Sequence, residues 1–227
     1  GGTGGANGHL DPSGAHVVLS LERLNRVRHI SAQDASITVE AGVKLCDIHA
    51  AAEDVGRMFG LSLASEGSCT IGGNLASNAG GVQTLRYGNA RDLCLGLEAV
   101  LADGSVLSGL APLRKDNTGY DLRHLLIGSE GTLGVITTAT LKLSSKPQRR
   151  DTMLCAVPSP EAALDLLYAL RDHLGDVVSA FELMSSLGLS LALKHFPDLR
   201  DPFAASHAWY VLADISAPAG SKDHLEA

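Results

Sequence analysis

The sequence predicts an α+β fold built in two successive parts. Residues 36–40 alternate between apolar and polar types, as in a strand with one buried face. Leu45, Ile48 and Ala52 recur instead at helical spacing. Residues 135–143 form a long stretch rich in β-branched side chains, which is typical of a strand. An apolar fraction of 45% is enough for a hydrophobic core.

The expected elements of the first part follow from these periods. Strands are expected over residues 16–21, 36–40, 93–101 and 135–143. A helix over 45–55 ends at Gly56, and one or two helical turns are expected over 71–77.

Two local signals refine this order. Asp103-Gly104 indicates a two-residue hairpin leading into Val106-Leu107. Asp121 is the expected N-cap of a short helix over residues 122–126.

A charged segment marks the expected domain boundary. Residues 146–150 contain Pro147 and no apolar side chain, so we expect one domain over 1–147 and a second over 148–227. The second domain has strand patterns at 153–157, 177–183 and 208–215, with helices between them. The first of these helices starts at Ser159-Pro160-Glu161 and ends near Gly175, and the next covers 185–194. This β-α-β-α-β order indicates part of an α+β layer.

Composition excludes several classes of function. The net charge of −7 and the absence of Lys/Arg clusters argue against a nucleic-acid partner. No run approaches the roughly 18 apolar residues of a membrane span. Cys46, Cys69, Cys94 and Cys155 form no C-x-x-C pair, so we expect reduced thiols in an intracellular protein. Cys69 is either a reactive thiol or, as we favour, a small residue in a tight turn.

Three glycine-rich segments carry the strongest functional signal. The first glycine segment covers residues 1–8, the second 66–81 and the third 128–136. Backbone without a Cβ atom approaches a ligand closely and turns its N–H groups inward. The alternative interpretation is a set of loops rich in turn residues. We favour a ligand cradle because two Gly-Gly pairs alternate with Asn74 and Asn78 in the second segment.

The pattern also limits the kind of ligand. Three segments suggest one elongated ligand touched at several points, which a dinucleotide fits better than a mononucleotide. None of them is a G-x-G-x-x-G or G-x-x-x-x-G-K-[ST] motif. A Rossmann domain is therefore disfavoured, and backbone amides are expected to hold the phosphates.

With these residues in view, the chain resembles the FAD-linked oxidases of the vanillyl-alcohol-oxidase type, and within them the D-2-hydroxyglutarate dehydrogenase branch. The resemblance covers nearly all of residues 1–146 and continues more weakly to the end. It rests on several motifs in the right order, namely Gly1-Gly2-Thr3-Gly4, Gly67-Ser68-Cys69-Thr70-Ile71-Gly72-Gly73-Asn74, Asn78-Ala79-Gly80-Gly81, Leu85-Arg86-Tyr87-Gly88, residues 113–122 and Gly128-Ser129-Glu130-Gly131-Thr132-Leu133-Gly134.

The resemblance implies a fold and a set of cofactor contacts. It implies a PCMH-type FAD-binding domain of two α+β subdomains, followed by a substrate-binding domain. The residues it assigns to FAD are Gly1, Gly2, Thr3, Gly4, Gly5, Gly67, Ser68, Thr70, Gly72, Gly73, Asn74, Asn78, Ala79, Gly80, Gly81, Tyr87, Glu130, Gly131, Gly134, Val135 and Ile136. Some relatives tether the flavin through a histidine where this chain has Thr3, so we expect non-covalent FAD.

The resemblance further implies oxidation of a D-2-hydroxy acid to the 2-oxo acid by hydride transfer to flavin N5. Alternatives are D-lactate or glycolate dehydrogenase, or a flavin-binding electron-transfer subunit without catalysis. The implied partners are the 2-hydroxy acid and an electron-transferring flavoprotein or quinone, with a homodimer left open. A cytoplasmic location is expected for a bacterial protein and a mitochondrial one for a eukaryotic protein.

Catalytic residues and a divalent metal site are expected outside this sequence. The chain begins within a glycine loop without an initiator Met and stops after an apolar stretch, so we expect a fragment that is catalytically silent by itself. Family members carry their metal-binding histidines and the basic residues that bind substrate in the C-terminal domain. The histidines here are expected to serve surface or packing roles. Arg114 and Lys115 are either a carboxylate-binding pair or, as we favour, part of a structural ion pair.

Overall fold

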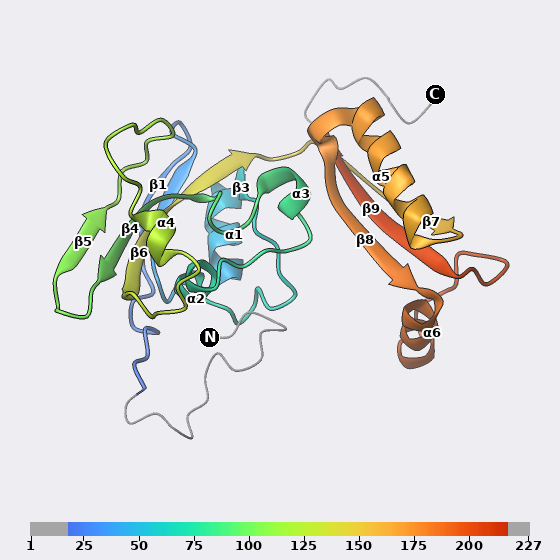
Figure 1. Ribbon diagram of the computed structural model, residues 1–227, viewed down its shortest axis with the longest axis horizontal. Coiled ribbons are helices and arrows are strands. Elements are labelled where there is room, and N and C mark those ends of the chain that lie inside the picture. Colours follow the sequence, from blue (N-terminus) through green and yellow to red (C-terminus); the bar gives the residue numbers. More distant parts are fainter. Residues whose placement is uncertain (1–17, 218–227) are drawn as a thin grey trace. The chain divides into compact units, whose positions relative to one another are not determined.

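A computed structural model describes residues 18–217, which divide into two compact units between Lys146 and Pro147 (Figure 1). Each unit combines antiparallel strands with helices, which confirms the predicted α+β class. The division falls inside the charged segment that the sequence marked as a boundary. None of the helices within residues 18–217 is long and apolar enough to cross a membrane.

The first unit is built on an antiparallel sheet. Its strand order is β1-β2-β6-β4-β5, and β3 pairs with the far end of β6. The strands are β1 (Val27–Ser31), β2 (Ser36–Glu40), β3 (Arg57–Phe59), β4 (Cys94–Val100), β5 (Val106–Gly109) and β6 (Val135–Ser145). Because β6 pairs with β2, β3 and β4, this long β-branched strand organises the sheet.

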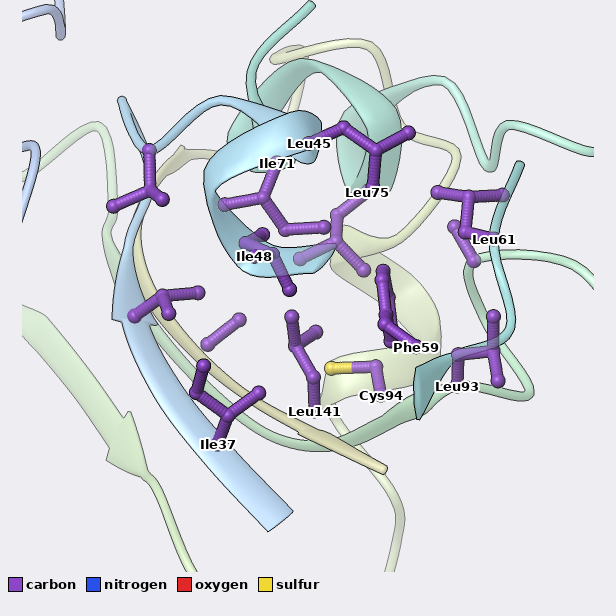
Figure 2. Packing of buried hydrophobic residues seen from close by; sticks show 14 of the residues in the cluster. Ile37, Leu45, Ile48, Phe59, Leu61, Ile71, Leu75, Leu93, Cys94 and Leu141 are labelled. Carbon is purple, nitrogen blue, oxygen red and sulfur yellow. The ribbon is translucent and has the colours of Figure 1, made fainter. Parts of the chain in front are cut away.

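Helices α1 (Leu45–Asp54) and α2 (Ile71–Ala76) lie over one face of this sheet and enclose the core (Figure 2). Two further helices of a single turn are α3 (Thr84–Tyr87), which has no buried residue, and α4 (Arg123–Leu126), whose Leu126 joins the core. Ile37 and Leu141 from the sheet pack with side chains of α1 and α2, such as Ile48 and Leu75, and all four are fully buried. Each such side chain contributes roughly 1.5–3 kcal/mol of stability. This core therefore fixes α2, which lies inside the second glycine segment.

A buried carboxylate joins the strands at one end of the sheet. Glu40 has no exposed surface and accepts hydrogen bonds from the backbone and guanidinium of Arg26 and from Nε of Arg28, at 2.9–3.3 Å. Hydrogen bonding by Arg26 outweighs the opposing effect of burial and lowers the pKa of Glu40 to about 2. On β4, Glu98 accepts from the hydroxyls of Thr137 and Thr138.

The second unit is a smaller sheet with helices between its strands. Its order is β7-β9-β8, all antiparallel, with β7 (Arg149–Val157), β8 (Val178–Ser185) and β9 (Trp209–Ala217). Helix α5 (Pro160–Leu174) begins at Ser159, whose side chain accepts from the Ala162 N–H, and ends at Gly175 with φ 65°. Its Ala163 packs on Val157 and Val211. Helix α6 (Ser186–His195) follows β8.

Two strand predictions were wrong. The described part of the predicted strand over 16–21 is irregular, and Val18 and Leu19 are exposed; positions 16 and 17 lie outside the described residues. The sheet edge is formed instead by β1, whose Arg- and His-containing sequence carried no apolar alternation. An edge strand pairs with only one neighbour, so backbone hydrogen bonding to β2 is enough to make residues 27–31 a strand without apolar alternation. Strand β7 also starts at Arg149, four residues before the predicted start at Met153, inside the segment taken as a boundary.

Two local details also differ from the predictions. The hairpin between β4 and β5 forms, but Leu101 pairs with Ser105, so Ala102 is part of the loop together with Asp103 and Gly104. Gly104 has φ 84°, as in a hairpin with a bulge. Asp121 is not an N-cap; Leu122 holds that position, and the Asp121 carboxylate pairs with Arg123.

We predict that Glu40→Gln lowers the free energy of unfolding by about 1–2 kcal/mol at neutral pH, because a charged acceptor for two exposed arginines is lost. Since the folded-state pKa is depressed, the wild-type advantage is complete above the ordinary value of 4.5 and disappears as the pH falls toward about 2. Urea unfolding at several pH values measures this. The control, Glu53→Gln, removes only an exposed pair with Lys146 and should change little. A Glu40→Gln deficit that stays constant on acidification would contradict the account.

Candidate functional site

The second glycine segment is held in place through its backbone. Its Glu66 and Cys69 carbonyls accept the N–H groups of Cys46 and Leu45 at 3.0 and 3.1 Å. In return, the Ile71 and Gly72 N–H groups donate to the carbonyls of Val43 and Ala41 at 3.0 and 2.8 Å. A segment with few large side chains can be fixed only weakly by side-chain packing, so backbone hydrogen bonds must hold it. The backbone contacts therefore set the position of α2 relative to the start of α1.

The third glycine segment lies against the second. The N–H groups of Gly128 and Glu130 donate to the carbonyls of Leu75 and Ala76 at 3.0 and 2.9 Å. These carbonyls belong to the last turn of α2, where the Leu75 carbonyl also accepts the Asn78 N–H at 3.0 Å. Two glycine-rich segments that are far apart in the sequence thus form one continuous strip of backbone. The sequence predicted that they share a ligand but did not predict this direct contact.

Arg91 joins the second segment to the residues that lead into the third. Its backbone N–H donates to Oδ1 of Asn78 at 3.0 Å, and its guanidinium donates to the carbonyls of Ile127, at 2.6 Å, and His124. Gly128 lies so close that a Cβ there would be 3.1 Å from the Arg91 Nη2. Sequence reasoning missed Arg91, because a single arginine between Ala90 and Asp92 matches no motif of binding or catalysis.

The glycines of the two segments fall into two groups. Gly72, Gly81 and Gly134 are required by packing, since an added Cβ would lie 2.7 Å from Ala41 Cβ, 2.2 Å from the Ser62 carbonyl and 2.9 Å from the Val100 carbonyl, respectively. Gly67, Gly80 and Gly131 are bare instead. Nothing lies within 4 Å of an added Cβ at Gly67 or Gly131, and at Gly80 the nearest atom is Thr84 Oγ1 at 3.5 Å. Gly131 has φ 80°, which by itself favours glycine, so a close-lying ligand would explain Gly67 and Gly80.

Backbone strain occurs in both segments. Asn78 and Glu130 have φ values of 48° and 52°, in the left-handed region that residues with a side chain seldom adopt. Asn78 is stabilised by its bond to Arg91, and the N–H of Glu130 is bound to Ala76. Such conformations cost of order 1–3 kcal/mol and concentrate at binding sites.

One buried polar group in the second segment lacks a partner. Asn74 has no exposed surface, and neither its side-chain oxygen nor its nitrogen has a hydrogen-bond partner. Burial of an unpaired amide costs about 1–3 kcal/mol. Native structures seldom tolerate such a group without a ligand, ion or water to pair it.

The remaining sequence-predicted residues take varied positions. Ser68 is exposed and its hydroxyl donates to the Ser65 carbonyl at 3.2 Å, whereas Thr70 precedes α2 without a side-chain bond to it. Buried Ala79 donates its N–H to the backbone carbonyl of Asn74 at 2.7 Å, and Gly73 lies half-buried within α2. Tyr87 ends α3 and packs against Gly60.

In the third segment, Val135 and Ile136 begin β6, with Ile136 buried. The first segment, with Gly1, Gly2, Thr3, Gly4 and Gly5, lies outside the described residues. Its predicted contacts therefore stay predictions.

Thiols and metal ligands contribute little to this site. Cys69 is 1% exposed and packs in the core, as expected of a small residue in a tight turn. Burial raises the pKa of Cys94 to about 12, which keeps that thiol protonated. Within residues 18–217 no cluster of three or more His, Cys, Asp or Glu side chains is arranged to hold a metal ion. The prediction that Arg114 and Lys115 take part in a structural ion pair is wrong for residues 18–217. Arg114 donates to the Leu143 carbonyl instead.

Comparison with known proteins adds a family context. A family model described as "FAD binding domain" matches residues 1–109, and one described as "FAD linked oxidases, C-terminal domain" matches residues 146–227. D-2-hydroxyglutarate dehydrogenase of Xanthomonas citri pv. viticola is 41% identical over 96% of this chain and 45% of its own length. The mitochondrial enzyme of that name from Danio rerio is 42% identical over 86% of this chain and 37% of its own length. The chain thus spans less than half the length of these relatives.

A solved structure shares the fold. An alkyldihydroxyacetonephosphate synthase superposes with a TM-score of 0.70 at 22% identity, covering 87% of this chain and 38% of that protein. At this identity the likeness concerns the fold alone. It agrees with the predicted PCMH-type arrangement of helices and strands.

The division of the glycines generates a paired test. We predict that Gly72→Ala lowers the free energy of unfolding by about 1–3 kcal/mol through overpacking against Ala41, although alanine is otherwise the better helix former. Gly67→Ala should change it by less than about 0.5 kcal/mol, since its Cβ meets open space. Denaturant unfolding of both variants provides the measurement. An equal loss of unfolding free energy in the two variants would show that the division into glycines required by packing and bare glycines is wrong.

Proposed function

This chain belongs to the FAD-linked oxidases, and from that premise we propose that the protein oxidises a D-2-hydroxy acid, D-2-hydroxyglutarate or a close analogue, to the 2-oxo acid. Curated relatives at 35–42% identity bear the name D-2-hydroxyglutarate dehydrogenase, which supports the substrate class. Within this chain, the observation that best supports cofactor binding is the hydrogen-bonded contact between the second and third glycine segments.

The residues of these segments fit FAD. A long cofactor with a pyrophosphate and a flat ring needs backbone that lies close to it over a distance. Gly67, Gly80 and Gly131 supply bare backbone, and the contacts of Leu75 and Ala76 hold the two segments together. The unpaired Asn74 amide adds a donor and an acceptor for a bound polar molecule. In this proposal the described residues of the FAD-binding domain, expected over 1–147, bind and orient the cofactor.

FAD, when bound, supplies the two-electron acceptor that takes the hydride from substrate C2, while a base takes the hydroxyl proton. The chain's own contribution is positioning. Arg91 bonds to Asn78 in the second segment and to Ile127, the residue just before the third, and so keeps the two segments from separating. Fixed segments hold the cofactor in one orientation. This matters because a small displacement of the reacting atoms lowers the rate of hydride transfer. The substrate clamp and any divalent metal are proposed to lie in the substrate-binding domain, which starts near residue 148.

The mode of cofactor attachment follows from Thr3. A threonine hydroxyl cannot form the histidyl bond that tethers flavin in some relatives, so the flavin is held without a covalent bond. Acid precipitation should leave the yellow colour in the supernatant.

We predict that Asn74→Leu weakens FAD binding roughly tenfold, the equivalent of about 1.4 kcal/mol, because the cofactor loses one buried hydrogen-bonding partner. Without FAD the same variant should be as stable as wild type or more stable, since a buried unpaired amide is removed. Fluorescence titration of the apoprotein and urea unfolding measure the two effects. Asn117→Leu, at an exposed position, is the matched control. Unchanged affinity in Asn74→Leu would remove this residue from the cofactor site.

We predict that D-2-hydroxyglutarate bleaches the flavin of the complete protein under anaerobic conditions, whereas the L enantiomer does not. D-lactate and glycolate should react more slowly at equal concentration. Stopped-flow absorbance of the flavin provides the rates. Fastest bleaching by D-lactate or glycolate would overturn the substrate assignment, and no bleaching by any 2-hydroxy acid would indicate an electron-transfer subunit.

A further inference from the structure

A pocket in the first unit lies next to the joined glycine segments and shares Arg91 with them. Its volume is about 280 Å³, and its lining includes Arg91, Arg114, Arg123, His124 and Lys142 but only a single acidic residue, Asp92. Four of these side chains, the three arginines and Lys142, are cationic, on a chain whose net charge is −7. We propose that this pocket is a binding site for a small anion that carries phosphate or carboxylate groups, beyond the FAD-dependent oxidation proposed above.

The positive charge of the pocket is only partly neutralised by neighbouring carboxylates. Within residues 18–217, Arg91, Arg114 and Lys142 form no ion pair with a carboxylate. The guanidinium groups of Arg91 and Arg114 contact backbone carbonyls, and that of Arg91 also contacts the His124 ring. Two carboxylates offset part of the charge: Asp92 lines the pocket, and Asp121 pairs with Arg123 and His124. Like charges held close together repel one another, and such a cluster raises the local concentration of anions. A bound anion would remove this repulsion.

The arginines are also fixed in position before any ligand arrives. The Arg91 guanidinium donates to Ile127 and His124 carbonyls, and the Arg123 guanidinium donates to the carbonyls of Cys94, at 2.9 Å, and Leu95. Little side-chain entropy is therefore lost when an anion binds. Planar guanidinium groups suit phosphate and carboxylate oxygens.

The position of Lys142 separates this pocket from the hydrophobic core. Its neighbours Leu141 and Leu143 are buried in the core, so the alternation of β6 directs Lys142 to the other face of the sheet. None of the residues of the second or third glycine segment lines the pocket. The protonated Cys94 thiol provides no nucleophile, so the pocket is suited to binding rather than to covalent chemistry.

Calorimetric titration of the purified chain, with and without added FAD and at constant ionic strength, tests this proposal. The probes are inorganic pyrophosphate and citrate. We expect one saturable site, with binding weakened at least about fivefold in Arg114→Gln and in Lys142→Gln. Lys115→Gln is the matched control, because Lys115 is exposed and outside the lining, and it should bind as wild type does. Tighter binding of pyrophosphate assigns a phosphate ligand, and tighter binding of citrate assigns a polycarboxylate.

Absence of saturable binding, equal affinities in all three variants, or release of flavin by either anion would overturn the proposal. Acetylation of lysines in the wild-type protein gives a second test that does not depend on how the variants fold. Pyrophosphate should protect Lys142 from acetylation and leave the acetylation of Lys115 unchanged. Equal acetylation of Lys142 with and without pyrophosphate would also contradict the site.

Discussion

The backbone hydrogen bonds of the second glycine segment are the constraint on which the site depends. Ordering one residue costs roughly 1–2 kcal/mol of conformational entropy, and glycine loses the most freedom. The segment meets this cost with backbone bonds to Ala41 and Val43 on one side and to Gly128 on the other. Buried Ile71 and Leu75 anchor it in the core. The segment is therefore held rigid by its backbone bonds and its buried residues. No side chain covers the backbone of Gly67 and Gly80.

This arrangement divides the work between the sheet and the segments attached to it. The antiparallel sheet, centred on β6, and its core fix α2. The third glycine segment leads directly into β6, so the strand that organises the sheet also positions the loop that contacts α2. A binding surface made from backbone is insensitive to side-chain rotamers and depends on the stability of the core. We infer that core and cofactor binding are coupled for this reason.

Much of the fold could be predicted because its elements have regular apolar periods. The spacing of Leu45, Ile48 and Ala52 placed α1, and Ser159-Pro160 placed the start of α5. Properties that depend on distant neighbours could not be predicted. Gly72 and Gly67 are indistinguishable in sequence, and only the proximity of Ala41 makes Gly72 a packing residue. The role of Arg91 and the basic pocket arise in the same way, from residues brought together by folding.

Hydrogen–deuterium exchange with and without FAD tests the central claim most directly, namely that the joined second and third glycine segments form one wall of the cofactor site. The account predicts that FAD slows exchange in peptides from both 66–81 and 128–136, with little change in the second unit's β7 and β9. Exchange that is unaffected in both glycine segments while FAD is demonstrably bound would contradict it.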